Sequence, residues 1–200
     1  MGRLVKYDRR NVKAWAGDSQ WRALRADFAR FRQHGYNGWV SEGFWPVVIY
    51  RLQRVTENAR PRWLWAPTRT VLALVRKLVA LVTHIHIDRA AKIGPGLLIP
   101  HCGPINVHRD TKIGADCSLF QGCTIGAGHI PGGAIIGDHV HIACHSSIIG
   151  PVKIGDEAMI APNSLVITDV PAGTTAIGVP ARILPGKWRA RDRASVPAVL

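Results

Sequence analysis

Aliphatic residues recur every six positions through the second half of the chain. The first run is Ile87, Ile93, Ile99 and Ile105, and a step of eight residues separates it from Ile113, Leu119 and Ile125. A step of eleven residues then leads to Ile136, Ile142, Ile148, Ile154, Ile160 and Val166. A period of six fits neither the repeat of an α-helix nor the simple alternation of a strand. It predicts short strands joined by corners, with three strands closing each coil of a β-helix.

Glycine and small residues occupy two further positions of this repeat. Glycine often follows the aliphatic residue, as at Gly94, Gly114, Gly126, Gly137 and Gly155. Near a corner it tolerates backbone angles that a Cβ would penalise. A mostly small residue stands four positions after the aliphatic one, and Cys117 and Cys123 both occupy this position. We therefore interpret these two cysteines as packed interior side chains rather than reactive thiols.

The two irregular steps in the repeat predict loops that leave the β-helix. The larger insertion, GAGHIPGGA (126–134), is flexible in composition and contains His129. Insertions between otherwise regular repeats commonly form the binding face of a solenoid. We therefore expect functional residues near these two steps.

The period divides the chain into three parts. Residues 1–85 lack it and predict an N-terminal α-helical region, residues 86–185 form the β-helix domain, and residues 186–200 are a loose basic C-terminal tail. Because a solenoid needs a cap, we expect the helical region to cover the open end of the β-helix. Peripheral contact of its Trp- and Arg-rich surface with a membrane is the alternative.

Three helices are expected in the N-terminal region. Apolar residues fall at helical spacing over 21–31 and 44–52, and a third apolar helix is expected over 70–83. Pro61 and Pro67 are expected to interrupt any helix between the second and the third.

The net charge of +13 favours an anionic partner or a solvated basic surface. A phosphate-bearing cofactor or an anionic membrane would fit, whereas no helix-turn-helix, zinc-finger or RNP signature supports nucleic acid. No signal-peptide core follows Met1, and the longest apolar stretch, 71–82, is interrupted by Arg76 and Lys77, so we expect a cytoplasmic protein.

The cysteines and histidines predict neither a disulfide framework nor a metal site. The four cysteines lack the CxxC spacing and the secretory context that would suggest disulfides. No zinc-like ligand spacing emerges among His139, His141, Cys144 and His145.

Four runs in the β-helix domain resemble the serine acetyltransferase family of hexapeptide acyltransferases. They are IDRAAKIGPGLLIPH (87–101), IGADCSLFQGCTIG (113–126), IIGDHVHIACHSSIIGPVKIG (135–155) and TTAIGVPARI (174–183), and GFWPVVIYRL (43–52) resembles the helical region of that family. The resemblance implies a left-handed parallel β-helix, assembled as a homotrimer or a dimer of trimers. It also implies acetyl transfer from acetyl-CoA to the hydroxyl of L-serine, a step of cysteine biosynthesis.

By this resemblance, His101 is the general base that removes the proton of the acceptor hydroxyl. Three positions depart from the pattern of the family. Pro100 replaces the aspartate that helps to hold the amino acid. His86 stands where the acidic residue that orients the base is expected, and Asp88, two residues along, is the candidate replacement. The second active-site histidine has no direct match, and His129 is the candidate for its role across a subunit boundary.

The resemblance also implies an acetyl-CoA groove between neighbouring β-helices. The matching positions are Cys144, Pro162, Gly178 and Arg182, with Arg182 facing a phosphate of CoA. A structural arginine that ties down the last turn is the alternative for Arg182.

Two other functions stay open. The departures at Pro100 and at the missing second histidine favour an O-acetyltransferase of a sugar or another small alcohol, such as a cell-surface polysaccharide precursor. A β-helix kept for assembly is the non-enzymatic alternative. The resemblance further suggests cysteine synthase as a partner that binds the C-terminus, which here ends in Leu200 and carries no support for it.

Overall fold

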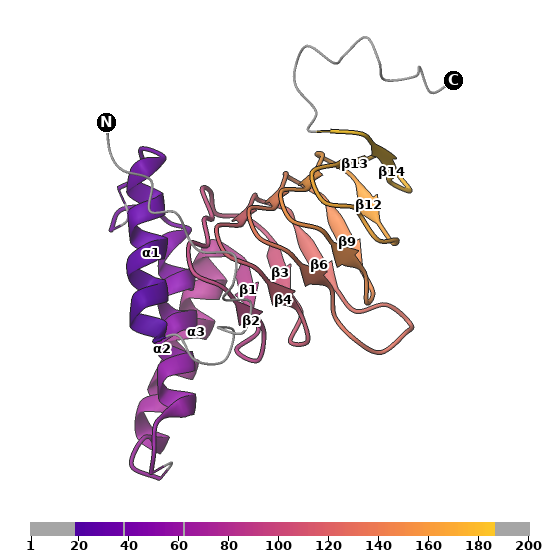
Figure 1. The fold of residues 1–200 in the computed structure, drawn as a ribbon. Coiled ribbons are helices and arrows are strands. Elements are labelled where there is room, and N and C mark those ends of the chain that lie inside the picture. Colours follow the sequence, from indigo (N-terminus) through magenta and orange to yellow (C-terminus); the bar gives the residue numbers. More distant parts are fainter. Residues whose placement is uncertain (1–18, 38, 62, 187–200) are drawn as a thin grey trace.

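The computed structural model describes residues 19–37, 39–61 and 63–186, with three helices followed by a parallel β-helix (Figure 1). The helices are α1 (Gln20–Gln33), α2 (Phe44–Asn58) and α3 (Ala66–Thr83). Sheet A contains β1 (Ile85–Ile87), β3 (Ile105–Val107), β6 (Thr124–Gly126), β9 (Ser147–Ile149) and β12 (Leu165–Val166). Sheet B contains β2 (Lys92–Ile93), β4 (Lys112–Ile113), β7 (Ile135–Ile136) and β10 (Lys153–Ile154). Sheet C contains β5 (Ser118–Leu119), β8 (His141–Ile142), β11 (Met159–Ile160), β13 (Thr175–Ile177) and β14 (Arg182–Leu184).

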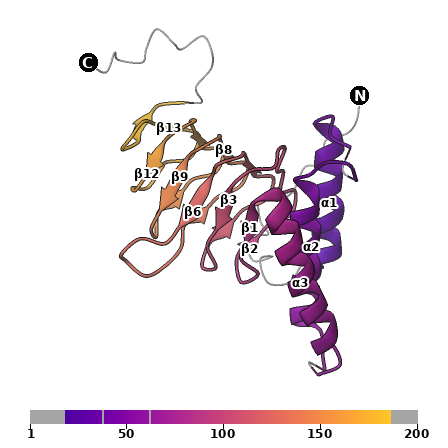
Figure 2. The same cartoon turned by 180° about the vertical axis from the view of Figure 1, so that it is seen from behind.

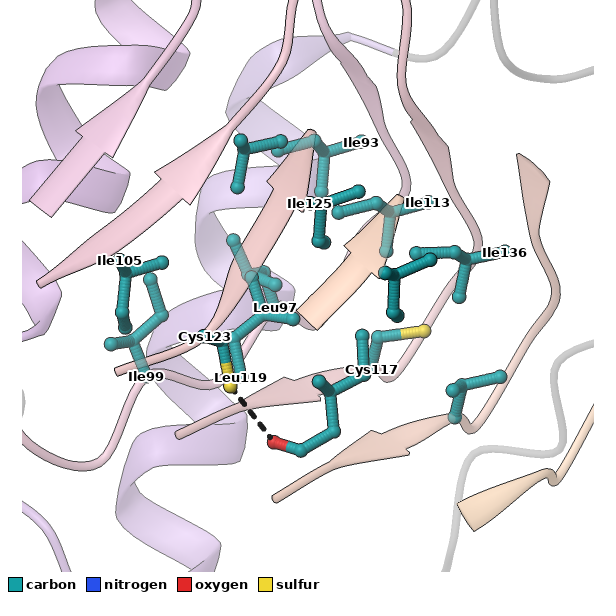
Figure 3. Packing of buried hydrophobic residues seen from close by; sticks show 14 of the residues in the cluster. Ile93, Leu97, Ile99, Ile105, Ile113, Cys117, Leu119, Cys123, Ile125 and Ile136 are labelled. Atoms are coloured by element: carbon teal, nitrogen blue, oxygen red, sulfur yellow. Dashed lines mark hydrogen bonds between the residues drawn. The ribbon is translucent and has the colours of Figure 1, made fainter. Parts of the chain in front are cut away.

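Each strand pairs in parallel with the equivalent strand one coil away, except that β14 returns antiparallel to β13. The inward aliphatic residues therefore stack in columns, such as Ile93 on Ile113 and Ile113 on Ile136 in sheet B (Figure 3). Ile113 and Ile136 are fully buried. The predicted fold class, a hexapeptide-repeat β-helix behind an N-terminal helical segment, is confirmed.

The register corrects the position of the shorter insertion. Ile87 pairs with Val107, and Ile85 pairs with Ile105, so the eight-residue step lies between Ile99 and Val107. The sequence had placed it between Ile105 and Ile113. Ile105 and Val107 both point inward on β3, and two inward residues at alternate positions make the hexapeptide register ambiguous. The correction moves the two extra residues into the segment that contains His101.

Aspartates close the corner between sheets B and C. The Asp138 carboxylate accepts a hydrogen bond from Ala115 N at 2.7 Å, and Asp156 accepts one from Asp138 N at 2.9 Å. A Cβ on Gly114 would collide with Asp138 Oδ1 and with the Gly137 carbonyl of the next coil. The glycine of the repeat is therefore required here because a carboxylate and a backbone approach it closely.

The helices cover the open end of the β-helix, as predicted (Figure 2). Their polar side chains satisfy its exposed backbone. Tyr50 Oη donates a hydrogen bond to Ala91 O at 2.7 Å. Arg30 donates to Gly96 O at 2.8 Å and to Ser118 Oγ at 3.0 Å. The first coil has no preceding coil to pair with, so these side chains take the place of strand partners.

Helix α3 differs from the prediction at its start and leaves one face uncovered. Pro67 lies in the first turn of α3, where its missing N–H costs nothing, rather than interrupting a helix. Leu74, Leu78 and Leu81 are between 58% and 72% exposed. The predicted packing of the helical region against the β-helix therefore describes α1 and α2 better than α3. None of the helices in the described ranges has the length and hydropathy needed to cross a bilayer.

Most of the predicted basic tail and residues 1–18 lie outside the described residues. What was predicted for residues 1–18 and for the tail after residue 186 therefore stays a prediction.

Candidate active site

The corner between sheets C and A gathers one predicted site residue from nearly every coil. Asn163 N donates to Cys144 O at 3.1 Å, and Leu165 N donates to Gly178 O at 2.9 Å, so these corner segments are stacked directly on one another. We name this set the corner column: His101, Gln121, Cys144, Pro162 and Gly178. The structure thus brings His101 to the same edge as three of the four predicted acetyl-CoA positions.

His101 lies in the shorter insertion with its side chain exposed. The insertion is held against the end of α3, because Gly103 N donates to Thr83 O at 2.9 Å and Ile105 N donates to His84 O at 3.0 Å. The Tyr36 and His101 rings are nearly perpendicular, with 6.0 Å between centroids and an interplanar angle of 85°. Phe120, one coil later, lies 6.5 Å from His101 between ring centroids. In the described part of the chain no hydrogen bond to the His101 ring is present.

The insertion also interrupts a ladder of backbone hydrogen bonds along the corner column. His145 N donates to Gln121 O at 2.9 Å, and the same bond recurs one coil later from Asn163. The equivalent donor one coil earlier is Gly122, whose expected acceptor is the His101 carbonyl. Among the described residues, Gly122 N makes no hydrogen bond. An unused N–H group therefore lies one coil below His101.

The structure does not bring Asp88 to His101. Asp88 follows β1 at the corner between sheets A and B, and its carboxylate accepts a hydrogen bond from Ala90 N at 2.8 Å. His101 lies at the other edge of sheet A. His86 is an outward residue of β1 in register with Asn106. The orienting role assigned to Asp88 stays a prediction, and within one subunit the geometry gives it no support.

His129 also lies on the far side of sheet A from His101 in the same subunit. It is exposed in the insertion between β6 and β7, at the corner between sheets A and B. That insertion folds back on its neighbours, since a Cβ on Gly133 would meet the backbone of Asp110 and one on Gly128 would meet Gly150. The role of His129 across a subunit boundary stays a prediction.

Arg182 opens β14 and lies opposite Ile177 in the antiparallel pair with β13. The intervening turn contains Gly178 and a cis Val179–Pro180 peptide bond. The Arg182 side chain is exposed, at the end of the corner column. The position is compatible with both roles that the sequence left open for this arginine.

Four residues around His101 were not predicted from the sequence. Tyr36 and Glu42 come from the segment between α1 and α2, and Phe120 and His141 come from the outer face of sheet C. The His141 ring lies 4.8 Å from the Phe120 ring between centroids. Burial lowers the pKa of His141, and the charge of Arg30 lowers it further. A hydrogen bond to the Glu42 carboxylate raises the pKa of the Cys102 thiol next to His101. Of these four, only Phe120 and His141 could have been found from the sequence. They flank Leu119 and Ile142, whose six-residue period places them on neighbouring coils.

The histidines considered for a metal site are spread over two corners and a strand. His139 lies at the corner between sheets B and C, 4.0 Å from Asp116 between Nδ1 and Oδ2, whereas His145 lies at the corner between sheets C and A. Within the described ranges, no three His, Cys, Asp or Glu side chains are arranged to hold a metal ion.

Comparison with known proteins connects this arrangement to one family. A family model described as bacterial transferase hexapeptide (six repeats) matches residues 129–168. A probable serine acetyltransferase 1 of Oryza sativa subsp. japonica is 40% identical over 153 residues, which cover 73% of this chain and 47% of that protein. The chain therefore spans about half the length of the curated relative it matches.

Solved structures of serine acetyltransferases share the fold. The soybean apoenzyme superposes with a TM-score of 0.72 at 29% identity, covering 86% of this chain and 72% of that one. A serine acetyltransferase in complex with CoA gives a TM-score of 0.70 at 26% identity, with the same two coverages of 86% and 72%. Together with the hexapeptide period and the corner column below His101, these similarities show that the chain belongs to the serine acetyltransferase family of hexapeptide-repeat proteins.

Proposed function

We propose that this protein transfers the acetyl group of acetyl-CoA to a hydroxyl of a small acceptor, with His101 as the general base. The observation that carries the proposal is the exposed His101 ring at the corner between sheets C and A, the same corner at which the later coils carry Cys144, Pro162 and Gly178. A related solved structure contains CoA, which supports acetyl-CoA as the donor.

The chemistry requires one proton acceptor and one oxyanion donor. Neutral His101 takes the proton of the acceptor hydroxyl as its oxygen attacks the thioester carbonyl carbon. The carbon–sulfur bond then breaks, and the imidazolium returns the proton to the CoA thiolate. Because Gly122 N has no hydrogen-bond acceptor among the described residues and lies one coil after His101, it is the backbone donor that we assign to the developing oxyanion.

The corner column offers a path for the pantetheine arm away from His101. Cys144 and Gly178 are half-buried, and Pro162 is exposed, so this edge presents small side chains and backbone to the cofactor. Arg182, exposed at the far end, pairs with a phosphate of CoA through charge-assisted hydrogen bonds.

The family supports L-serine as the acceptor, since the relatives and neighbours are named serine acetyltransferases. The product of that reaction would enter cysteine biosynthesis. One residue of this chain bears against an amino acid as the acceptor. The residue before His101 is the buried Pro100, which has no charged group to bind an amino acid.

We further infer a homotrimer with the site at the boundary between subunits. His101 and His129 lie at opposite edges of sheet A within one subunit, so only a neighbouring subunit would bring the insertion of residues 127–134 to His101. Size-exclusion chromatography with light scattering checks the assembly, and a stable monomer with full activity contradicts it.

The test of the proposed function is thiol release from acetyl-CoA in the presence of serine, homoserine and methyl glycosides. His101→Ala should lower kcat by about 10²–10⁴-fold, the usual contribution of a general base. His139→Ala, which changes another exposed histidine at a different corner, is the matched control and should keep full turnover. Absence of thiol release with every acceptor, or full turnover by His101→Ala, would contradict the proposal.

A further inference from the structure

A continuous wall of aromatic rings runs from the helical cap across His101 to the third coil. Tyr36 and His101 are 6.0 Å apart between ring centroids, His101 and Phe120 are 6.5 Å apart, and Phe120 and His141 are 4.8 Å apart. Such spacings are those of contacting aromatic rings. His101 is the exposed member in the middle, and Tyr36 and Phe120 stay partly exposed on either side of it.

Tyr36 is held in place from behind. Its backbone N donates to Phe31 O at 2.9 Å, and its ring meets the buried Phe31 ring edge-on, with 6.3 Å between centroids. Among the described residues no hydrogen bond from Tyr36 Oη is present. The ring therefore has a fixed position, and its hydroxyl is available to a ligand beside His101.

The charged side chains near this wall are already bonded within the chain. The Glu42 carboxylate accepts a hydrogen bond from the Cys102 thiol, and Arg30 donates to Gly96 O and Ser118 Oγ. Burial lowers the pKa of His141, which favours its neutral ring. Pro100, next to His101 in sequence, is buried and apolar. An amino acid bound at this wall would have to take Glu42 or Arg30 from these bonds. Otherwise its ammonium and carboxylate would lie against apolar rings, and desolvating such charges without partners is costly.

We propose that the acceptor is a sugar, whose face of C–H groups rests on the Tyr36 and Phe120 rings while one of its hydroxyls reaches His101. This inference rests on the proposed function and names its acceptor class. Ligand sites commonly combine aromatic walls with a few polar groups that set orientation. Here Tyr36 Oη is the polar group that would bond a second ring hydroxyl. L-Serine has no ring face to cover this wall.

Thiol release from acetyl-CoA tests the inference with methyl α- and β-pyranosides of glucose, galactose and mannose, and with L-serine. The pyranosides should be acetylated with a higher kcat/KM than L-serine. Phe120→Leu and Tyr36→Leu should raise the pyranoside KM by about tenfold, the effect of losing one aromatic contact, with the acetyl-CoA KM unchanged. Tyr36→Phe should show a smaller increase, because it removes only the hydroxyl.

Trp63→Leu is the matched control, since Trp63 is 75% exposed in the connection between α2 and α3. It should leave both KM values unchanged. Circular dichroism melting identifies any variant that has lost its fold, and saturation-transfer NMR measures pyranoside binding without turnover. Bound pyranosides should give signals that weaken in Phe120→Leu.

The outcomes separate the two proposals. Efficient turnover of L-serine with no turnover or binding of pyranosides overturns the acceptor class and leaves the proposed function standing. Pyranoside KM values in folded Phe120→Leu and Tyr36→Leu equal to that of Trp63→Leu overturn the role of the wall. Absence of thiol release with every acceptor overturns the proposed function, and with it the inference.

Discussion

Arg51 and Asp27 form a fully buried ion pair that joins the helical cap to the first coil of the β-helix. Arg51 Nε lies 2.9 Å from Asp27 Oδ2, and neither side chain is exposed to solvent. Both partners also bind coil backbone. Arg51 donates to Ile93 O at 2.7 Å, and Leu97 N donates to Asp27 Oδ1 at 2.8 Å. The pair therefore replaces hydrogen bonds that a preceding coil would have made.

Replacing Asp27 should destabilise the protein strongly. Asp27→Ala leaves the Arg51 charge buried without its partner, and breaking a buried pair in this way costs about 3–5 kcal/mol. Urea unfolding followed by circular dichroism measures the change in the free energy of unfolding. Glu57→Ala is the control, because Glu57 pairs with Arg54 at 3.3 Å near the surface and should cost at most about 1 kcal/mol. Equal losses in the two variants would show that the buried pair does not hold the cap.

The sequence predicted the β-helix because its inward residues repeat at a fixed interval that few other structures share. It misplaced the shorter insertion because Ile105 and Val107 both point inward, so two registers fit the same letters. The partnership of Asp27 and Arg51 was not predictable. Nothing in the spacing of two charged residues on separate helices shows that both turn toward the same coil.

The residues of the candidate site also fall into those that the sequence predicted and those that it did not. His101, Cys144, Pro162 and Gly178 were identified from the sequence through the resemblance to the serine acetyltransferase family, and the stacking of one coil on the next places them at one corner. Tyr36 was not, because it reaches His101 from the helical region, which has no period to align it with the coils. Asp88 was assigned because it stands two residues after His86, but it lies at the corner between sheets A and B, across sheet A from the base.

The four cysteines should fall into two classes of reactivity. Burial raises the pKa of Cys117 to about 12 and also raises the pKa of Cys123, and both thiols are enclosed in the core. Cys102 and Cys144 are partly exposed. In native protein at pH 8, a disulfide reagent such as DTNB should label Cys144 and, more slowly, Cys102, because thiolate is the reactive form. Labelling of Cys117 or Cys123 before unfolding, read by mass spectrometry, would contradict their assignment to the interior.

Saturating acetyl-CoA, which lacks the free thiol by which CoA itself would consume DTNB, should slow the labelling of Cys144 but not that of Cys102 if the corner column lines the CoA groove. Cys144→Ser and Cys102→Ser variants each leave one accessible thiol, so the two rates can be measured separately. Equal protection of both thiols, or of neither, would contradict the placement of CoA along the column.

Stability should fall on acidification in a way that depends on His141. Burial lowers the pKa of His141 from its ordinary 6.5. The unfolded chain therefore takes up a proton at about pH 6.5, while the folded chain does so only at lower pH. The free energy of unfolding accordingly falls as the pH is lowered through that interval. His141→Phe removes this contribution, so its free energy of unfolding should change less between pH 7.5 and pH 5.5 than that of the unmodified chain. His139→Phe, at an exposed histidine, should not reduce the dependence, and identical profiles for all three proteins would rule out His141 as its source.

Arg182 distinguishes a CoA-binding residue from one that only ties down the last turn. If Arg182 binds a phosphate of CoA, Arg182→Ala should raise the KM for acetyl-CoA by at least about tenfold, since hydrogen bonds to charged groups contribute about 1.5–3 kcal/mol. The KM for the acceptor should not change.

Acetyl-dephospho-CoA, which lacks the 3′-phosphate, tells which phosphate Arg182 binds. If it binds the 3′-phosphate, Arg182→Ala should no longer discriminate between acetyl-CoA and acetyl-dephospho-CoA. Arg89→Ala, at the opposite end of the β-helix where Arg89 pairs with Glu57 at 3.4 Å, should keep the original KM. A lower melting temperature with an unchanged KM would instead assign Arg182 to the antiparallel pair of β13 and β14, whose turn it flanks.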